Sequence, residues 1–140
     1  MLPGLKAGFT LDARLEADSE HLMWLGLCEL RIIDDSRWPW LILVPQRPDI
    51  EELHELTPLD QAMLTFEANM VAHALKRVTG CTKINTGALG NIVRQLHVHV
   101  IARFQTDPAW PSPVFGKPVR PYETAAREAL VEKLRARLES

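Results

Sequence analysis

The spacing of hydrophobic and polar residues changes several times along the chain, and each change predicts an element. Apolar residues alternate with polar ones or run together over residues 24–33, 40–44, 81–88 and 96–104, which predicts four strands. Helical spacing predicts a short helix over residues 12–19, a long helix over residues 57–78 and an amphipathic helix over residues 122–138. Because the strands come in pairs with helices between the pairs, we expect an α+β fold with an antiparallel sheet.

The long helix has signals at both ends. Thr57 is a capping residue, Pro58 suits the first helical position, Asp60 lies three residues after the cap, and Gly80 follows the last periodic residue. The apolar residues at helical spacing are predicted to form its core face: Leu59, Met63, Phe66, Met70 and Ala74. Residues 105–121 hold five of the ten prolines and are predicted to form a long loop.

Length and composition narrow the class of protein. Residues 1–140 are expected to form one domain, because this length suits a single core. With 46% hydrophobic and 24% charged residues, the chain is typical of globular proteins, and its net charge of −2 gives no footprint for a nucleic-acid polymer. Residues 1–10 contain no apolar run, so we expect neither a signal peptide nor a membrane anchor, and hence a cytoplasmic protein with Cys28 and Cys81 reduced and buried.

The candidate chemistry lies on the last predicted strand. Alternation places one wholly apolar face toward the core and sets His97 and His99 on the other face, about 6.5–7 Å apart at their backbones, together with Gln95, Ile101 and Arg103. Three interpretations are open. The pair is a polar patch in solvent, a metal-binding pair that needs a third ligand such as His54 or His73, or a nucleophile with a hydrogen-bonding helper.

The surrounding sequence favours the nucleophile. The run over residues 83–101, Lys-Ile-Asn-Thr-Gly-Ala-Leu-Gly-Asn-Ile-Val-Arg-Gln-Leu-His-Val-His-Val-Ile, resembles the signature of the histidine triad (HIT) superfamily. That signature is His-φ-His-φ-His-φ-φ, where φ is a hydrophobic residue, preceded by a glycine-bearing turn and Gly-Gln-Ser/Thr-Val. The order of elements is also similar over residues 9–104. The resemblance implies a bacterial-type HIT domain with a Gln-x-His-x-His variant of the triad and an antiparallel sheet of about five strands with a main helix and a C-terminal helix.

The same resemblance implies roles for individual residues. His97 falls on the histidine that attacks the α-phosphorus of a nucleotide to form a nucleotidyl-histidine, and His99 on the histidine that binds a phosphate oxygen. The phosphate- and ribose-binding positions fall on Asn85, Gly90, Asn91, Ile92 and Val93. The resemblance further implies a nucleotide hydrolase or nucleotidyl transferase acting on purine nucleoside phosphoramidates or related compounds, as a homodimer, with no metal and no other cofactor.

Two residues depart from the family pattern. Gln95 stands where the first histidine is usual, and we expect its amide to orient the His97 ring. Ile92 replaces a serine or threonine and removes a hydroxyl donor near the phosphate. We therefore expect a working nucleophile with altered activation. The alternatives are a non-catalytic nucleotide-binding regulatory or scaffold module, and a metal-dependent enzyme that uses both histidines as ligands.

Other residues are weaker candidates for the functional site. Asp34 or Asp35 is a candidate ribose ligand, although tight turns also favour aspartate. Trp38 and Trp40 either wall a base pocket or pack in the core, and Arg103 either meets phosphate or lies on the surface. In the proline-rich loop, Trp110 and Phe115 are candidates to close over the nucleotide or a second subunit. The remaining histidines are interpreted as packed or surface residues: His21, His54 and His73.

Overall fold

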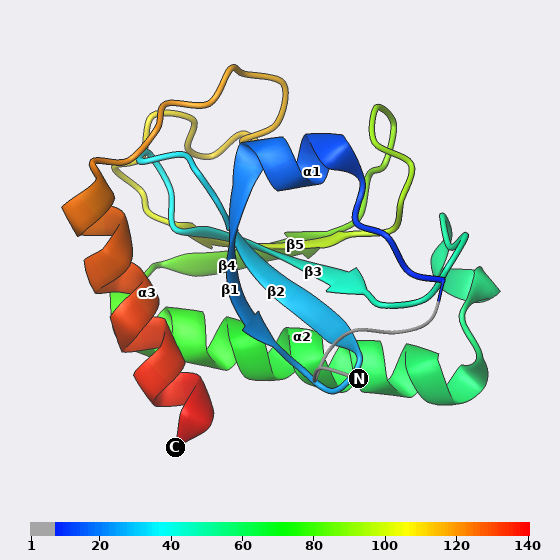
Figure 1. The fold of residues 1–140 in the computed structure, drawn as a ribbon. Coiled ribbons are helices and arrows are strands. Elements are labelled where there is room, and N and C mark those ends of the chain that lie inside the picture. The colour runs from blue at the N-terminus through cyan, green and yellow to red at the C-terminus, as the bar shows by residue number, and fades with distance from the viewer. Residues whose placement is uncertain (1–7) are drawn as a thin grey trace.

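Five antiparallel strands form one sheet in the computed structural model, which describes residues 8–140. The strand order is β1-β2-β3-β5-β4, so β1 and β4 are the edges (Figure 1). The strands are β1 (Ser19–Trp24), β2 (Cys28–Ile33), β3 (Trp40–Pro45), β4 (Lys83–Gly87) and β5 (Val98–Arg103). The expected antiparallel α+β fold is confirmed, with five strands where the hydrophobic pattern alone indicated four.

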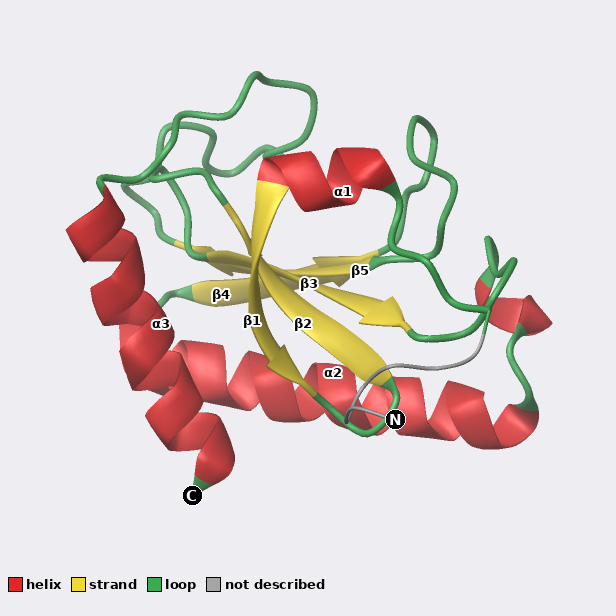
Figure 2. Cartoon of the chain, in the orientation of Figure 1, coloured by secondary structure: helices red, strands yellow, loops and turns green. Residues whose placement is uncertain are grey.

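Helices cover the two faces of the sheet differently. The helices are α1 (Ala13–Asp18), α2 (Pro58–Thr79) and α3 (Thr124–Glu139), with a short 3₁₀ helix η1 (Leu53–Glu55) before α2. In Figure 1, α2 runs along one face, α1 lies over the opposite face and α3 packs against one end of α2. The long connections before and after β5 lie on the α1 side (Figure 2), which is therefore the face where loops gather.

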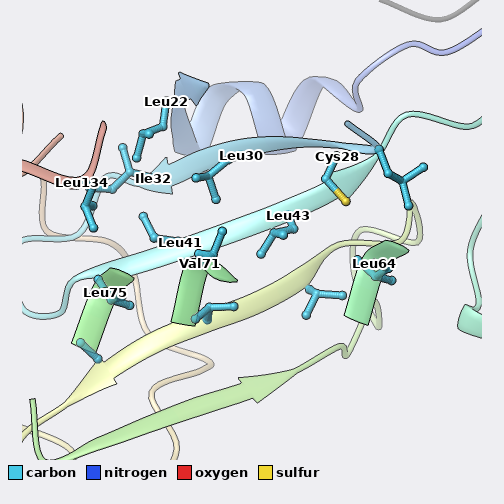
Figure 3. Packing of buried hydrophobic residues seen from close by; sticks show 14 of the residues in the cluster. Leu22, Cys28, Leu30, Ile32, Leu41, Leu43, Leu64, Val71, Leu75 and Leu134 are labelled. Carbon is cyan, nitrogen blue, oxygen red and sulfur yellow. The ribbon is translucent and has the colours of Figure 1, made fainter. Parts of the chain in front are cut away.

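The main hydrophobic core lies between the sheet and α2. Leu30, Leu41 and Leu43 of the central strands pack with Leu64 and Val71 of α2 (Figure 3). Alternate residues of β5 join this core as predicted from their spacing: Val98, Val100 and Ala102, with Leu96 before the strand. The opposite face of β3 and β5 belongs to a second apolar cluster, which includes Trp38, Trp40, Ile42 and Ile101. The site described below lies on this second face.

The ends of α2 agree with the sequence, but its predicted core face is wrong in part: Ala74 is buried and Met63 packs against the core, as expected. Thr57 Oγ1 accepts a hydrogen bond from the backbone of Asp60 at 3.1 Å, and Gly80 ends the helix at a positive φ of 66°. However, Leu59 is 73% exposed and Phe66 is 65% exposed. The buried residues of α2 are Asp60, Leu64, Glu67, Val71, Ala74 and Leu75.

Two buried acids explain the error. Both carboxylate oxygens of Glu67 accept backbone hydrogen bonds, from Leu27 at 2.8 Å and from Cys28 at 2.9 Å. Asp60 forms a two-point ion pair with Arg47. A buried acid with such partners can occupy a core-facing position, so polarity misled the assignment of the face.

The first predicted strand is also wrong in part. Residues 24–33 hold the end of β1, a turn and β2, and the strand β1 at Ser19–Trp24 was missed. Every residue of β2 is buried, although a half-buried strand was expected. Glu29 and Arg31 are buried because they pair with each other at 2.6 Å, and Arg31 also donates to Ser19. A buried ion pair on one face of a strand gives the same alternation of polar and apolar residues as a face exposed to solvent, so the sequence alone does not distinguish the two.

Three further features bear on expectations from the sequence. Cys28 and Cys81 are free and buried, as predicted, and burial raises the pKa of the Cys28 thiol. In α3, Leu134 is buried and Leu130 and Leu138 pack against the core, which confirms its amphipathic pattern. Among the helices of residues 8–140, none is long and apolar enough to cross a bilayer.

Candidate active site

His97 lies immediately before β5 and is held by the chain that leads into the strand. Its side chain is 8% exposed, and its Nδ1 lies 2.7 Å from the backbone carbonyl oxygen of Gln95. A carbonyl can only accept, so Nδ1 carries the proton of the neutral ring. The other nitrogen, Nε2, then keeps a free lone pair. This is the protonation state that a histidine nucleophile requires.

His99 lies beside His97 on the same face of β5. The two rings are arranged edge to face, with their centroids 4.9 Å apart. Trp40 of β3 places its indole Nε1 2.9 Å from His99 Nδ1, and the Phe115 ring lies 4.9 Å from the His99 ring. Burial, with a smaller effect of the neighbouring His97, lowers the pKa of His99 to about 3. His99 is therefore neutral at physiological pH.

The side chain of Gln95 does not hold the His97 ring, contrary to the sequence-based expectation. Its Oε1 accepts a hydrogen bond from the backbone N–H of Asp12, and its Nε2 donates to the carbonyl of Thr10, both at 2.8 Å. Gln95 thus fastens the segment before α1 with its amide and orients His97 with its backbone carbonyl. Any residue type at position 95 supplies that carbonyl, so the orienting contact does not require a histidine there.

A cavity of about 260 Å³ opens beside His97. It lies between the segment around η1 and the connection from β4 to β5. Its other lining residues are Glu51, Glu52, Leu53, His54, Ala88, Leu89, Gly90 and Leu96. Sequence reasoning missed the contribution of residues 51–54, because nothing in their pattern shows that they fold back toward β5.

The predicted phosphate-binding segment is only partly at this cavity. Gly90 lines it and has a positive φ of 72°, a conformation that suits glycine. Asn91 is exposed and lines an adjoining hollow with Gly90. Ile92 is 81% exposed, with its carbonyl accepting from Arg14 at 3.2 Å, and Val93 packs against the second apolar cluster. Phosphate binding by these residues stays a prediction.

Asn85 and Arg103 belong to a buried network that anchors the proline-rich loop. Arg103 is buried, contrary to the surface interpretation, and it binds both carboxylate oxygens of Asp107, at 2.9 and 3.1 Å. It also donates to Asn85 Oδ1 and to the carbonyl of Ser112. Burial alone would raise the pKa of Asp107, but hydrogen bonds from Arg103 and the backbone hold that pKa well below its usual range.

The two aromatic residues of the proline-rich loop that were candidates to cover the nucleotide lie at different positions. Trp110 lies beside the Arg103 guanidinium at 5.7 Å from ring centroid to Cζ, in a cation–π contact. Phe115 packs edge to face on Trp40 at 5.7 Å and on His99 at 4.9 Å. The loop therefore covers His99 with Phe115 and is fastened to the sheet through Arg103.

The two candidate ribose ligands are already paired with other residues. Asp35 is buried and binds Arg37 at 2.7 Å, and Arg37 keeps the pKa of Asp35 below its usual value despite the opposing effect of burial. Asp34 accepts from the backbone of Tyr122 and pairs with Arg127 of α3 at 3.2 Å. Neither lines the cavity beside His97.

The metal interpretation lacks a third ligand in the described part of the chain. No group of three histidine, cysteine or acidic side chains in residues 8–140 is arranged to hold a metal ion. Of the other histidines, His54 lines the cavity, His73 is exposed on α2 and His21 binds Glu29 on the distant strand pair.

Comparison with known proteins agrees with the geometry. The model of the HIT domain family matches residues 14–106, most of the chain. The chain belongs to the HIT family. Members of this family are generally nucleotide-binding hydrolases or transferases. No protein with a curated function matches this HIT protein significantly.

Solved structures of other HIT proteins match almost the whole chain. A HIT protein from Sinorhizobium meliloti is 58% identical, with a TM-score of 0.90 over 92% of this chain and 96% of its own. A histidine triad protein from Marinobacter aquaeolei is 41% identical, with a TM-score of 0.92 over 95% and 98% of the two chains. One from Bradyrhizobium japonicum is 40% identical, with a TM-score of 0.92 over 94% and 98%.

Proposed function

We propose that this HIT protein is a nucleotide hydrolase or nucleotidyl transferase that acts at the α-phosphate of a nucleoside phosphoramidate or a related nucleotidyl compound. The observation that carries the proposal is the contact between His97 Nδ1 and the Gln95 carbonyl, because it leaves Nε2 as a fixed nucleophile beside a cavity. His99, neutral and next to it, is the candidate donor to the phosphate. Membership of the HIT family supports the substrate class.

The reaction has two displacements at phosphorus. In the first, the Nε2 lone pair of His97 attacks the α-phosphorus, and the bond from phosphorus to the leaving nitrogen or oxygen breaks. The leaving group departs with that electron pair and takes a proton from water. In the second, water attacks phosphorus, the Nε2–P bond breaks with its electrons returning to Nε2, and a nucleoside monophosphate and a proton are released. In a transferase, another nucleophile replaces the second water.

The protein contributes mainly position and electrostatics to such a reaction. The backbone contact to Nδ1 keeps Nε2 in one orientation, and it stabilises the positive charge that develops on the ring during attack. The low exposure of both histidines limits competition by water for these contacts. Gly90 allows the backbone to approach the cavity beside His97 closely.

Turnover of a fluorogenic adenosine phosphoramidate tests the proposal. Wild type should release the fluorescent amine, His97→Ala should not, and His73→Ala should match wild type because His73 is exposed on α2. Rapid quench in an alkaline denaturant, which preserves the acid-labile P–N bond, followed by mass spectrometry should find a nucleotidyl adduct on the peptide that contains His97. Equal turnover by wild type and His97→Ala would contradict the proposed enzymatic function.

A non-catalytic nucleotide-binding module is the second candidate. Two observations favour it: Ile92 offers no hydroxyl donor, and Phe115 covers His99. Binding of AMP by calorimetry, with no turnover of any phosphoramidate by wild type, would support this module over the enzyme.

We also propose that the protein works as a homodimer in the cytoplasm, with its α2–β4 side as the interface. Among residues 8–140, no strand pairs with the outer side of the edge strand β4, which leaves its backbone groups there available for pairing. Next to it, an apolar groove of about 520 Å³ lies between α2 and β4, and Phe66 of α2 is exposed. A second copy would cover both features symmetrically. Leu64 and Ala68 are among the residues that line this groove.

A further inference from the structure

The indole of Trp40 makes a contact with His99 that the proposed reaction does not yet use. Trp40 Nε1 lies 2.9 Å from His99 Nδ1, and both side chains are buried. Trp40 pairs with Ile101 in the β3–β5 register, while Ile42 pairs with His99, so the indole reaches His99 from the neighbouring strand. The contact is therefore built from two central strands of the sheet.

The chemistry of the two groups fixes the position of a proton. An indole N–H can only donate, so His99 Nδ1 must accept and cannot carry a proton while the contact exists. The single proton of the neutral imidazole is then on Nε2. A doubly protonated ring would place two N–H groups against each other. His97 is the titratable group beside His99, since Trp40 and Phe115, which pack on it from β3 and from the loop, carry no charge.

We propose that Trp40 is a positioning residue that holds His99 in its Nε2–H form, so that His99 offers a donor rather than an acceptor to the substrate. The role of that donor rests on the proposed function. The assignment of the proton does not, because it follows from the Trp40 contact alone. Without this contact, a neutral imidazole could place its proton on either nitrogen and would offer the donor only part of the time.

Nitrogen NMR on the ¹⁵N-labelled wild-type protein tests the assignment directly. We expect the His99 nitrogens to show the Nε2–H pattern from pH 5 to pH 8. We also expect a scalar coupling across the hydrogen bond, between Trp40 Nε1 and His99 Nδ1. A proton on His99 Nδ1, or a His99 ring that takes up a second proton in this range, would overturn the proposal whatever the enzyme activity.

Substitutions then distinguish the effect of the indole N–H donor from the effect of the aromatic ring as a whole. Trp40→Phe should abolish the coupling, allow both forms of His99 and lower kcat by roughly three- to tenfold, the effect of one net hydrogen bond, with a smaller change in KM. Trp38→Phe removes a buried indole of the same cluster and should keep the coupling. Trp24→Phe, on the edge strand β1, should keep wild-type turnover.

The outcomes distinguish this inference from the proposed function. Unchanged kcat in a folded Trp40→Phe protein would show that Trp40 does not position His99 for reaction. If wild type shows the coupling and the Nε2–H form but turns over no nucleotide, the proposed enzyme fails while the assignment of the proton stands. Should Trp40→Phe not fold, the wild-type spectra alone decide the assignment.

Discussion

His97 and His99 stand two residues apart and carry their protons on different ring nitrogens. The difference arises because each Nδ1 faces a group with one hydrogen-bonding capability, a carbonyl for His97 and an indole N–H for His99. A backbone group and a side chain that never titrates therefore set the states of both rings. Neither state depends on a third histidine.

The buried neutral state of His99 predicts a loss of stability in acid. Burial, and to a smaller extent His97, lowers the pKa of His99 from 6.5 to about 3 in the folded protein. Between these two values the unfolded chain binds a proton that the folded chain does not, so the free energy of unfolding falls as pH falls through this window. By pH 5 the loss due to His99 should be about 2 kcal/mol.

Urea unfolding at pH 7 and pH 5 measures this loss. His99→Gln keeps an oxygen that can accept from Trp40 but has no titrating group, so its stability should depend less steeply on pH than that of wild type. His73→Gln, at an exposed position of α2, should retain the wild-type dependence. Parallel pH profiles for wild type and His99→Gln would contradict the prediction.

The two hydrogen bonds that the Gln95 amide forms with Asp12 and Thr10, here called the Gln95 clamp, lead to a second prediction about a single residue. Gln95→Ala removes both hydrogen bonds to the segment before α1 and should lower the free energy of unfolding by about 1–2 kcal/mol. The carbonyl that orients His97 is unaffected by this substitution, so the His97 ring should keep its proton on Nδ1 by NMR. Gln105→Ala, at an exposed position, serves as the control for denaturant unfolding. Equal free energies of unfolding for the two variants would show that the Gln95 clamp does not contribute to stability.

At the scale of single elements, α2 is attached to the sheet by one buried acid as well as by apolar packing. Glu67 uses both oxygens to accept backbone N–H groups at the start of β2, and Gly26 lies so close that an added Cβ would be 3.2 Å from Glu67 Oε2. Glu67→Gln replaces one acceptor by an NH₂ group that faces a donor. It should cost about 1–3 kcal/mol of stability.

Thermal and urea unfolding test this prediction against a matched control. Glu128→Gln makes the same chemical change at an exposed position of α3 and should alter stability by less than about 0.5 kcal/mol. If the Glu67→Gln protein is as stable as the Glu128→Gln protein, the carboxylate of Glu67 does not contribute to stability, and the prediction is wrong.

The elements show what could and could not be predicted from sequence. Caps and periodicity give the ends of α2 within one residue and place His97 and His99 on one face of β5, because these signals are local. The contacts of Glu67 with Leu27 and Cys28, which help to set the buried face of α2, join residues distant in sequence, and so does the Trp40–His99 contact. Glu29 and Arg31 are only two residues apart, but alternation along a strand does not show that they are buried as a pair. Polarity alone does not reveal whether a charged residue has such a partner.

Across the whole molecule, the two faces and the two edges of the sheet have different surroundings. One face is covered by α2 and the other holds the histidines under Phe115, while β4 leaves one edge unpaired within the described chain. The arrangement separates the proposed dimer interface on α2 and β4 from the Trp40–His99 contact, which lies on the opposite face.

The exposed apolar side of α2 predicts an association that a single charge should weaken. Phe66→Asp should convert a dimer into a monomer, because the interface would then bury a carboxylate that has no partner. Sedimentation velocity or light scattering gives the mass. Val119→Asp, an exposed apolar residue of the proline-rich loop, should leave the mass unchanged. A wild-type monomer at high protein concentration would contradict the prediction.

The hydrogen bonds of Gln95 also set the order in which the site can form during synthesis. They join residue 95 to residues 12 and 10, which are 83 and 85 positions earlier in the chain. A ribosome adds about 5–20 residues per second, so the segment before α1 leaves the ribosome several seconds before its partner exists. The segment before α1 therefore stays undocked until residue 95 has been made, and the histidines gain these surroundings only after that point.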